Sequence, residues 1–134
     1  MAQVGNGGYA VRGAMKHPPV LGERIMIFKP EWILNIMIGA KTLEIRGTRL
    51  TGRSYLLGCK GKIYARAAFG KPFHIETTEQ WNELRPRHRV GSKKLPYKKT
   101  WGLPLEKVVH FKKPHAYEVR RGPVGIVIFK PVGA

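Results

Sequence analysis

Aspartate is absent from this sequence, and all eight acidic residues among its 134 positions are glutamates. The absence excludes a Ser-His-Asp triad with its usual third member, and an EF-hand loop, which takes several of its oxygen ligands from aspartate. It also excludes an aspartate-rich magnesium site. Acid chemistry in this protein therefore depends on glutamate.

Cysteine is nearly absent as well. A single cysteine, Cys59, can form neither an internal disulfide nor a cysteine-rich zinc site. The histidines His74, His88, His110 and His115 show no metal-binding spacing and are expected to be surface or supporting residues. The sequence therefore predicts no metal site and no cofactor.

Long apolar runs are missing too. The longest, at 32–38, is interrupted by Asn35 and is too short to cross a bilayer. The N-terminal residues lack the continuous apolar core of a signal peptide. We therefore expect no membrane partner and an intracellular protein, located in the cytoplasm or the nucleus.

Positive charge is abundant. Lys and Arg number 25, and the formal net charge is +17. Such a charge attracts polyanions, of which RNA is the first expectation and DNA the alternative. The densest stretch, 85–99, holds seven cations and no acid, and Pro86, Gly91 and Pro96 argue against regular structure there. We predict a long basic loop able to neutralise several phosphates.

The apolar patterns predict one α+β domain over residues 23–134, preceded by a flexible basic segment, 1–22. Helices are predicted over 30–38 and after Thr77, which forms a capping box with Gln80. The last strand is apolar almost throughout and is expected at the centre of the sheet. The predicted strands cover 24–28, 41–46, 55–59, 62–69, 108–111 and 124–129. This order suits a small, partly open β-barrel with two or three short helices.

A short motif crosses the predicted junction between the first helix and the second strand. Gly39, Lys41, Glu44 and Arg46 form G-x-K-x-x-E-x-R, and a leucine-rich strand follows. The combination resembles the ASCH domain, a branch of the PUA-like superfamily, over about residues 24–130. Glu44 and Arg46 are two positions apart on a strand and share one face. Lys41 joins that face only if the turn before the strand redirects it.

The resemblance implies an RNA-binding module, with Lys41 and Glu44 meeting near the mouth of a cleft beside helix 30–38. Some ASCH proteins resemble hydrolases instead, either ribonucleases or amidohydrolases that act on N4-acetylcytidine. In that alternative Lys41 and Glu44 would be catalytic, but Glu44 occupies the position of the amidohydrolase threonine, so the nucleophile is not identified. A third alternative is a basic component of a larger ribonucleoprotein whose cleft stays empty.

The side chains expected to contact RNA are cations, one glutamate and aromatic rings on which bases can stack. Tyr64 is expected to face outward beside Lys62 and Arg66, whereas Trp32 and Trp81 are expected in the core. We expect single-stranded or loop nucleotides in the cleft, and a monomeric protein. The full set of nucleic-acid-binding candidates is Lys41, Glu44, Arg46, Arg49, Arg53, Tyr64, Arg85, Arg87, Arg89, Lys93, Lys94, Tyr97, Lys98, Lys99 and Trp101.

Overall fold

A computed structural model describes residues 15–50, 53–119 and 125–133. Most of the predicted segment 1–22 lies outside these residues, as does Val124 of the predicted last strand. The elements are β1 (Arg24–Ile27), α2 (Pro30–Met37), β2 (Leu43–Arg46), β3 (Ser54–Cys59), β4 (Lys62–Phe69), β5 (Phe73–Ile75), α3 (Thr78–Glu83), α4 (Arg85–His88), β6 (Thr100–Ala116) and β7 (Ile126–Ile128).

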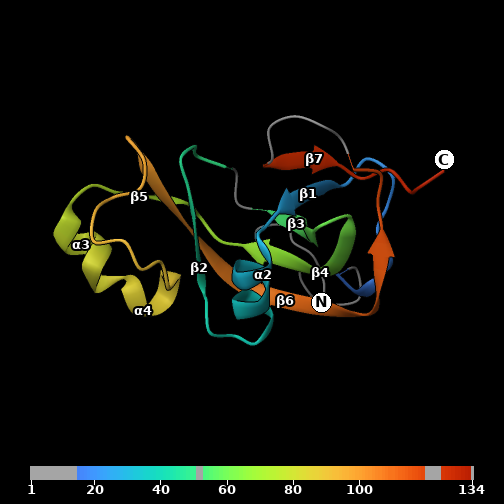
Figure 1. Cartoon of the computed structure of the whole chain (residues 1–134), viewed down its shortest axis with the longest axis horizontal. Helices are drawn as coiled ribbons and strands as arrows, with labels where there is room; N and C mark the ends of the chain where they lie inside the picture. Colours follow the sequence, from blue (N-terminus) through green and yellow to red (C-terminus); the bar gives the residue numbers. More distant parts are fainter. Residues whose placement is uncertain (1–14, 51–52, 120–124, 134) are drawn as a thin grey trace, which may run out of the picture.

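The strands form one mixed, curled sheet in the order β2-β6-β4-β3-β1-β7, and β5 also pairs with β6. β1 and β3 are parallel, whereas the other neighbours are antiparallel. Figure 1 shows α3 and α4 at one end of the molecule, and β7 with the C-terminus at the other. The structure confirms the predicted α+β class with a barrel-like sheet and short helices.

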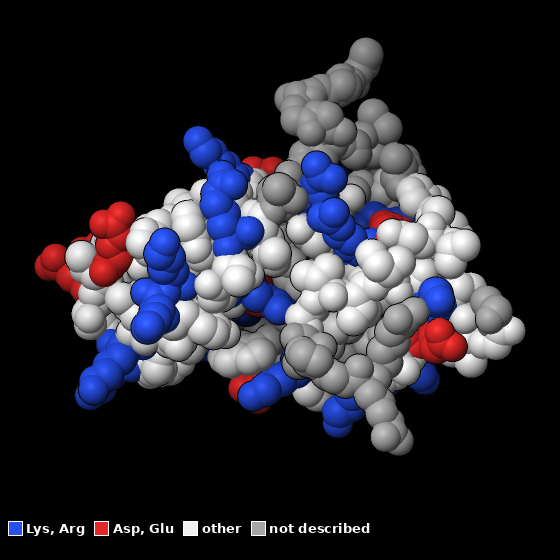
Figure 2. Space-filling model, turned by 90° about the horizontal axis from the view of Figure 1, so that it is seen from above, with Lys and Arg blue, Asp and Glu red and all other residues white. Residues whose placement is uncertain are grey.

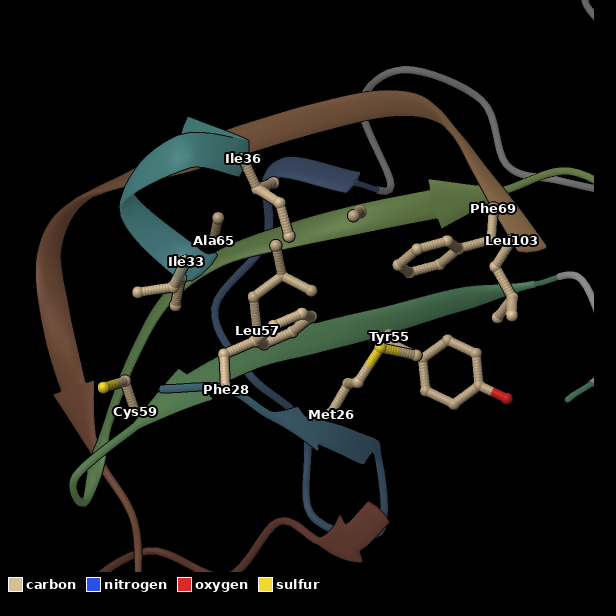
Figure 3. Close-up of a cluster of buried hydrophobic side chains, with 11 residues drawn as sticks. Met26, Phe28, Ile33, Ile36, Tyr55, Leu57, Cys59, Ala65, Phe69 and Leu103 are labelled. Atoms are coloured by element: carbon tan, nitrogen blue, oxygen red, sulfur yellow. The ribbon is translucent and has the colours of Figure 1, made fainter. Parts of the chain in front are cut away.

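The main core lies between α2 and the middle of the sheet. Ile33 and Ile36 of α2 point onto Leu57 of β3 and Ala65 of β4, as Figure 3 shows. Cys59 belongs to the same cluster and is buried, as predicted. This packing fixes α2 against the sheet and so determines where the residues that follow the helix enter it.

Local signals in the sequence explain both predicted helices. Pro30 occupies the first turn of α2, where its missing N–H is not needed, and Gly39 follows the helix with φ +81°. The capping box before α3 is present, since Thr77 accepts from the Gln80 N–H at 3.0 Å and the Gln80 side chain returns to the Thr77 N–H. These caps were predictable because they depend on neighbours in the sequence.

Two strands differ from prediction. β6 runs for 17 residues instead of the four predicted at 108–111, and β5 was not predicted. Pro104 and Pro114 lie within β6 and hide its pattern. Only three of its 17 residues, Thr100, Gly102 and Leu103, are buried, so buried and exposed residues do not alternate along the strand. β5 has three residues and is held by pairing with β6, which no local pattern reveals.

The prediction that the last strand is central was wrong. Among the described strands, β7 pairs with β1 alone and ends the strand order. Ile126 and Val127 are half-buried, and Ile128 is 49% exposed. The apolar composition of β7 reflects its contact with the core, where Ile126 and Val127 pack, and does not reveal how many strands pair with it.

The expectation that Arg66 faces outward was also wrong, since its side chain is only 2% exposed. The guanidinium makes a two-point ion pair with Glu23, at 2.6 Å from Nε and 2.8 Å from Nη2. It also donates to the carbonyl oxygens of Met15, His17 and Pro18. All five of its N–H donors are therefore used, and they tie residues 15–18 to β4.

Candidate functional site

A cavity of about 680 Å³ opens between α2, the ends of β1 and β2, and the segment that follows α4. Lys60 and Gly61, in the turn between β3 and β4, and Val127 of β7 also line it. β2 and β7 are the two ends of the strand order, so the cavity lies between the two edges of the curled sheet. This is the side of the helix on which the sequence predicted a cleft. Its walls include Phe28, Trp32, Lys41, Glu44, Arg46 and Tyr97.

The turn between α2 and β2 brings Lys41 to Glu44. β2 begins only at Leu43, so Lys41 belongs to the turn and not to the strand. The N–H groups of Ala40 and Lys41 both donate to the Asn35 carbonyl oxygen at 2.9 Å, which fixes this turn. Of the two alternatives that the spacing allowed, the structure therefore shows the redirected lysine.

Glu44 lies between two cations. Its Oε1 is 3.6 Å from Lys41 Nζ, and its Oε2 accepts from Arg46 Nε at 2.7 Å. Lys41 Nζ also donates to the His88 carbonyl oxygen at 2.6 Å, and Arg46 Nη2 donates to the Ile27 carbonyl oxygen at 3.2 Å. The three charges are thus held by backbone from two other segments as well as by one another.

These groups lie deeper than predicted. Lys41 is 2% exposed and Glu44 is 6% exposed, so they form the inner wall of the cavity and not its mouth. Burial lowers the pKa of Lys41 because it disfavours the charged ammonium; the Glu44 carboxylate opposes this effect, and Arg46 adds to it. A partly desolvated carboxylate between two cations can accept hydrogen bonds from a ligand while the cations donate.

Aromatic rings cover the charged wall. Lys41 Nζ lies 5.0 Å from the centre of the Trp32 ring, and the Arg46 guanidinium carbon lies 5.2 Å from that of Phe28. Trp32 is only partly buried and lines the cavity, so its assignment to the core was incomplete. Tyr97, 48% exposed, lies against Gly47 at the outer rim, where a Cβ on the glycine would come within 2.8 Å of the ring.

A search of solved structures finds the same architecture in the ASCH protein of Zymomonas mobilis. A point mutant of that protein superposes with a TM-score of 0.65 and 13% sequence identity, covering 84% of this chain and 92% of that one. This chain has the ASCH fold. A second crystal structure of the same protein gives a TM-score of 0.61 and 12% identity over 81% and 88% of the two chains. No protein-family model and no curated protein matches the sequence.

Within this ASCH fold, the basic stretch 85–99 is only partly a loop, since its first four residues form α4. Arg85 does not face solvent freely. It donates to the carbonyl oxygens of Val90 and Ser92 and to Asn82 Oδ1, and so shapes the turn after α4. The stretch lines the cavity with Val90, Pro96 and Tyr97 instead of with its cations. The cations that project into solvent are Arg87, Arg89, Lys93, Lys94, Lys98 and Lys99.

The remaining candidates lie elsewhere on the ASCH fold. Arg49 is exposed, with its guanidinium carbon 5.8 Å from the centre of the Trp101 ring, and Arg53 is exposed just before β3. Tyr64 is half-buried against the main core and does not line the cavity. In Figure 2, Lys and Arg side chains project from several separate places on the face shown. The positive charge is therefore more dispersed in space than along the sequence.

His88 was expected to be either a surface or a supporting residue, and the structure shows a supporting one. Its side chain is fully buried, and its ring stacks on Trp81 with centroids 3.8 Å apart. Nδ1 accepts from the Val90 N–H at 2.9 Å, so the proton resides on Nε2, 2.9 Å from the Trp81 carbonyl oxygen. Burial lowers the pKa of His88, which favours this neutral form. His88 thereby positions the carbonyl oxygen that holds Lys41.

Other chemistry has little support in the described residues. They contain no group of three or more His, Cys, Asp or Glu side chains placed to hold a metal ion. No described helix is both long and apolar enough to cross a membrane. Among the described side chains lining the cavity, the hydroxyl groups are those of Tyr97 and Tyr117, and burial raises the pKa of Tyr117. A serine, threonine or cysteine nucleophile is therefore not placed among them.

Replacing Glu44 by glutamine should lower the pKa of Lys41 further, because both the charge of Glu44 and its hydrogen bond raise that pKa. In the wild type, the pKa of Lys41 is lower in the folded protein than in the unfolded chain. At a pH between these two pKa values the unfolded chain binds more protons than the folded protein, so the free energy of unfolding rises with pH across that interval. The pKa of Lys41 is measured in both proteins by following its Cε chemical shift against pH by NMR. The control is Glu79→Gln, a change at an exposed position on α3, which should leave the titration curve of Lys41 unchanged. An unchanged or raised pKa of Lys41 in Glu44→Gln would show that Glu44 does not stabilise the charged lysine.

Proposed function

We propose that this chain is an ASCH-family RNA-binding protein that takes a single-stranded or loop nucleotide into the cavity beside α2. The observation that carries the proposal is the Glu44 carboxylate, buried between Lys41 and Arg46 in the cavity wall. Bases present amino and imino donors next to carbonyl acceptors. The Glu44 carboxylate could accept from the amino or imino group of a base, while Lys41 and Arg46 on either side donate to its carbonyl oxygens.

Single-stranded RNA fits this site better than a duplex. A base must leave its helix to enter a cavity, and unpaired RNA bases are free to do so. Trp32 and Tyr97 at the walls offer apolar surface for a base that has lost its stacking neighbours. The size of the cavity, about 680 Å³, lies within the range of small-molecule sites and allows a whole nucleoside to enter.

The exposed cations supply the second part of binding. Arg87 and Arg89 lie at the end of α4, and Lys93, Lys94, Lys98 and Lys99 follow. Arg49 and Arg53 lie in the sequence between β2 and β3. Phosphate contacts of this kind give affinity that falls steeply with salt and carries no sequence information. We assign recognition to the cavity and general affinity to these side chains.

The test compares two lysines. Lys41→Met removes a cation from the cavity wall, and Lys112→Met removes one from an exposed position of β6. Affinity for a random-sequence single-stranded RNA of 12 nucleotides is measured by fluorescence anisotropy at fixed salt. A charged hydrogen bond contributes about 1.5–3 kcal/mol, so Lys41→Met should weaken binding roughly 10- to 150-fold. Lys112→Met should cost far less.

Wild-type protein that does not bind RNA would reject the proposal, as would equal losses in the two variants. Binding that is steeply salt-dependent yet indifferent to Lys41 and Glu44 would favour the ribonucleoprotein component. Thermal unfolding of each variant checks that the fold is retained.

A hydrolase is the second candidate, and the lowered pKa of Lys41 is the observation that favours it. A lysine that is neutral more often than usual can act as a base. Incubating the wild type with RNA and with N4-acetylcytidine tests this alternative. Turnover that disappears in Lys41→Met while RNA still binds would establish an enzyme, whereas no turnover of either substrate leaves a binding protein.

A further inference from the structure

A row of three side chains crosses the sheet at the edge of the cavity. Arg46 of β2 lies directly opposite Trp101 of β6, and Trp101 lies directly opposite His74 of β5. Residues directly opposite in antiparallel strands share a face of the sheet. Arg46 lines the cavity, whereas Trp101 and His74 lie beyond it. The row therefore begins inside the candidate site and continues outside it.

The outer part of the row is an aromatic stack under a cation. The rings of Trp101 and His74 lie 5.0 Å apart at 27°, and the exposed Arg49 has its guanidinium carbon 5.8 Å from the Trp101 ring centre. Trp101 is only partly buried. The acid nearest to this stack in the described contacts is Glu76, 3.5 Å from His74 Nδ1 and itself exposed. A ring with a movable cation over it is a stacking surface for a nucleobase.

Arg46 connects the two places. Of its five N–H donors, the contacts among the described residues use two, one to Glu44 and one to the Ile27 carbonyl oxygen. The other donors are available to an anion between the cavity and Trp101. A phosphate that joins two consecutive nucleotides is such an anion.

We infer that the protein holds a second nucleotide outside the cavity: its base stacks on Trp101 beneath Arg49, and the phosphate between the two nucleotides contacts Arg46. This inference rests on the proposed function, and it adds that the ligand is at least a dinucleotide whose chain follows the row from β2 to β5. His74, whose ring stacks on Trp101, holds that ring in place. Arg49 moves outward to admit the base, and this movement is open to it because its side chain is exposed.

The test is the dependence of affinity on ligand length. The probes are the nucleoside 5′-monophosphate that binds most tightly of the four, followed by ligand-detected NMR, and a hexanucleotide of that base, followed by anisotropy. Trp101→Leu keeps apolar packing but removes the ring, so it should weaken the hexanucleotide roughly 5- to 100-fold and leave the mononucleotide unchanged. Trp101→Phe should restore most of the loss. Arg49→Gln should weaken the hexanucleotide more than Arg24→Gln, which removes the same charge from an exposed position of β1.

Each result separates the two proposals. Trp101→Leu that leaves hexanucleotide binding intact, or weakens both probes equally, overturns the second-nucleotide site while the cavity proposal stands. Wild-type protein that binds neither probe, or mononucleotide binding indifferent to Lys41→Met, overturns the proposed function itself. Thermal unfolding of Trp101→Leu and Trp101→Phe shows whether equal weakening reflects loss of fold.

Discussion

Replacing Arg66 by alanine is expected to lower the free energy of unfolding by about 3–5 kcal/mol. The buried guanidinium satisfies the Glu23 carboxylate and the carbonyl oxygens of residues 15–18 at once. Its removal takes two hydrogen bonds from the Glu23 carboxylate, which keeps the one from the Val20 N–H, and one from each of the three carbonyl oxygens. Urea denaturation with the slope held common to both proteins measures the loss.

Two further variants sharpen this prediction. Arg66→Lys keeps the charge but has three donors in place of five, so it should recover only part of the stability. Arg24→Ala, an exposed arginine on β1, should change stability by no more than about 0.5 kcal/mol. A free energy of unfolding for Arg66→Ala within 1 kcal/mol of the wild-type value would show that the hydrogen bonds of Arg66 contribute little to stability. Faster amide exchange at residues 15–18 in Arg66→Ala would identify the segment that it releases.

Replacing Trp81 by alanine should cost about 3–5 kcal/mol of stability and should also weaken RNA binding. Trp81 is fully buried, stacks on His88 and donates from Nε1 to the Ser92 carbonyl oxygen at 2.8 Å. It does not line the cavity. Its effect on binding passes through His88, whose carbonyl oxygen holds Lys41, and through Val90 in the cavity wall. Denaturation and anisotropy on the same samples measure both effects.

Trp81→Phe provides the matched control. It keeps an aromatic ring on His88 but loses the hydrogen bond to Ser92, so about 1–3 kcal/mol should be lost and RNA binding largely kept. Both measurements are made at a temperature where each variant is fully folded. If folded Trp81→Ala binds RNA as tightly as the wild type, the segment after α4 does not position the cavity wall.

The parts of the fold that the sequence predicted are those that depend on near neighbours. α2, the capping box of α3 and the hairpin of β3 and β4 follow from caps, glycines and alternation within a few residues. The structure closes this hairpin with a tight turn at Lys60 and Gly61, where φ is 49° and 84°. β7 and β6 were misplaced or shortened because pairing partners far along the chain decide where strands lie and where they end.

The candidate site divides in the same way. Lys41, Glu44 and Arg46 lie within six positions, so their meeting was predictable once the turn was considered. His88 and Trp101 reach them from 47 and 55 positions beyond Lys41 and Arg46, through a carbonyl oxygen and a strand register. No local pattern marks such contacts. The basic stretch 85–99 was visible as charge, but its apolar and backbone contacts with the cavity were not.

β6 determines when, during synthesis, the cavity can first exist. Its first residues pair with β2 and β5, and its later residues pair with β4. The pairing of Leu43 with Pro104 spans 61 positions. A chain still growing on the ribosome therefore adds at least these 61 positions while Lys41 and Glu44 lack the strand that fixes them, and while Leu43 and Ile45 are unpaired. The β2 edge of the sheet is therefore completed only after the first part of β6 has been made.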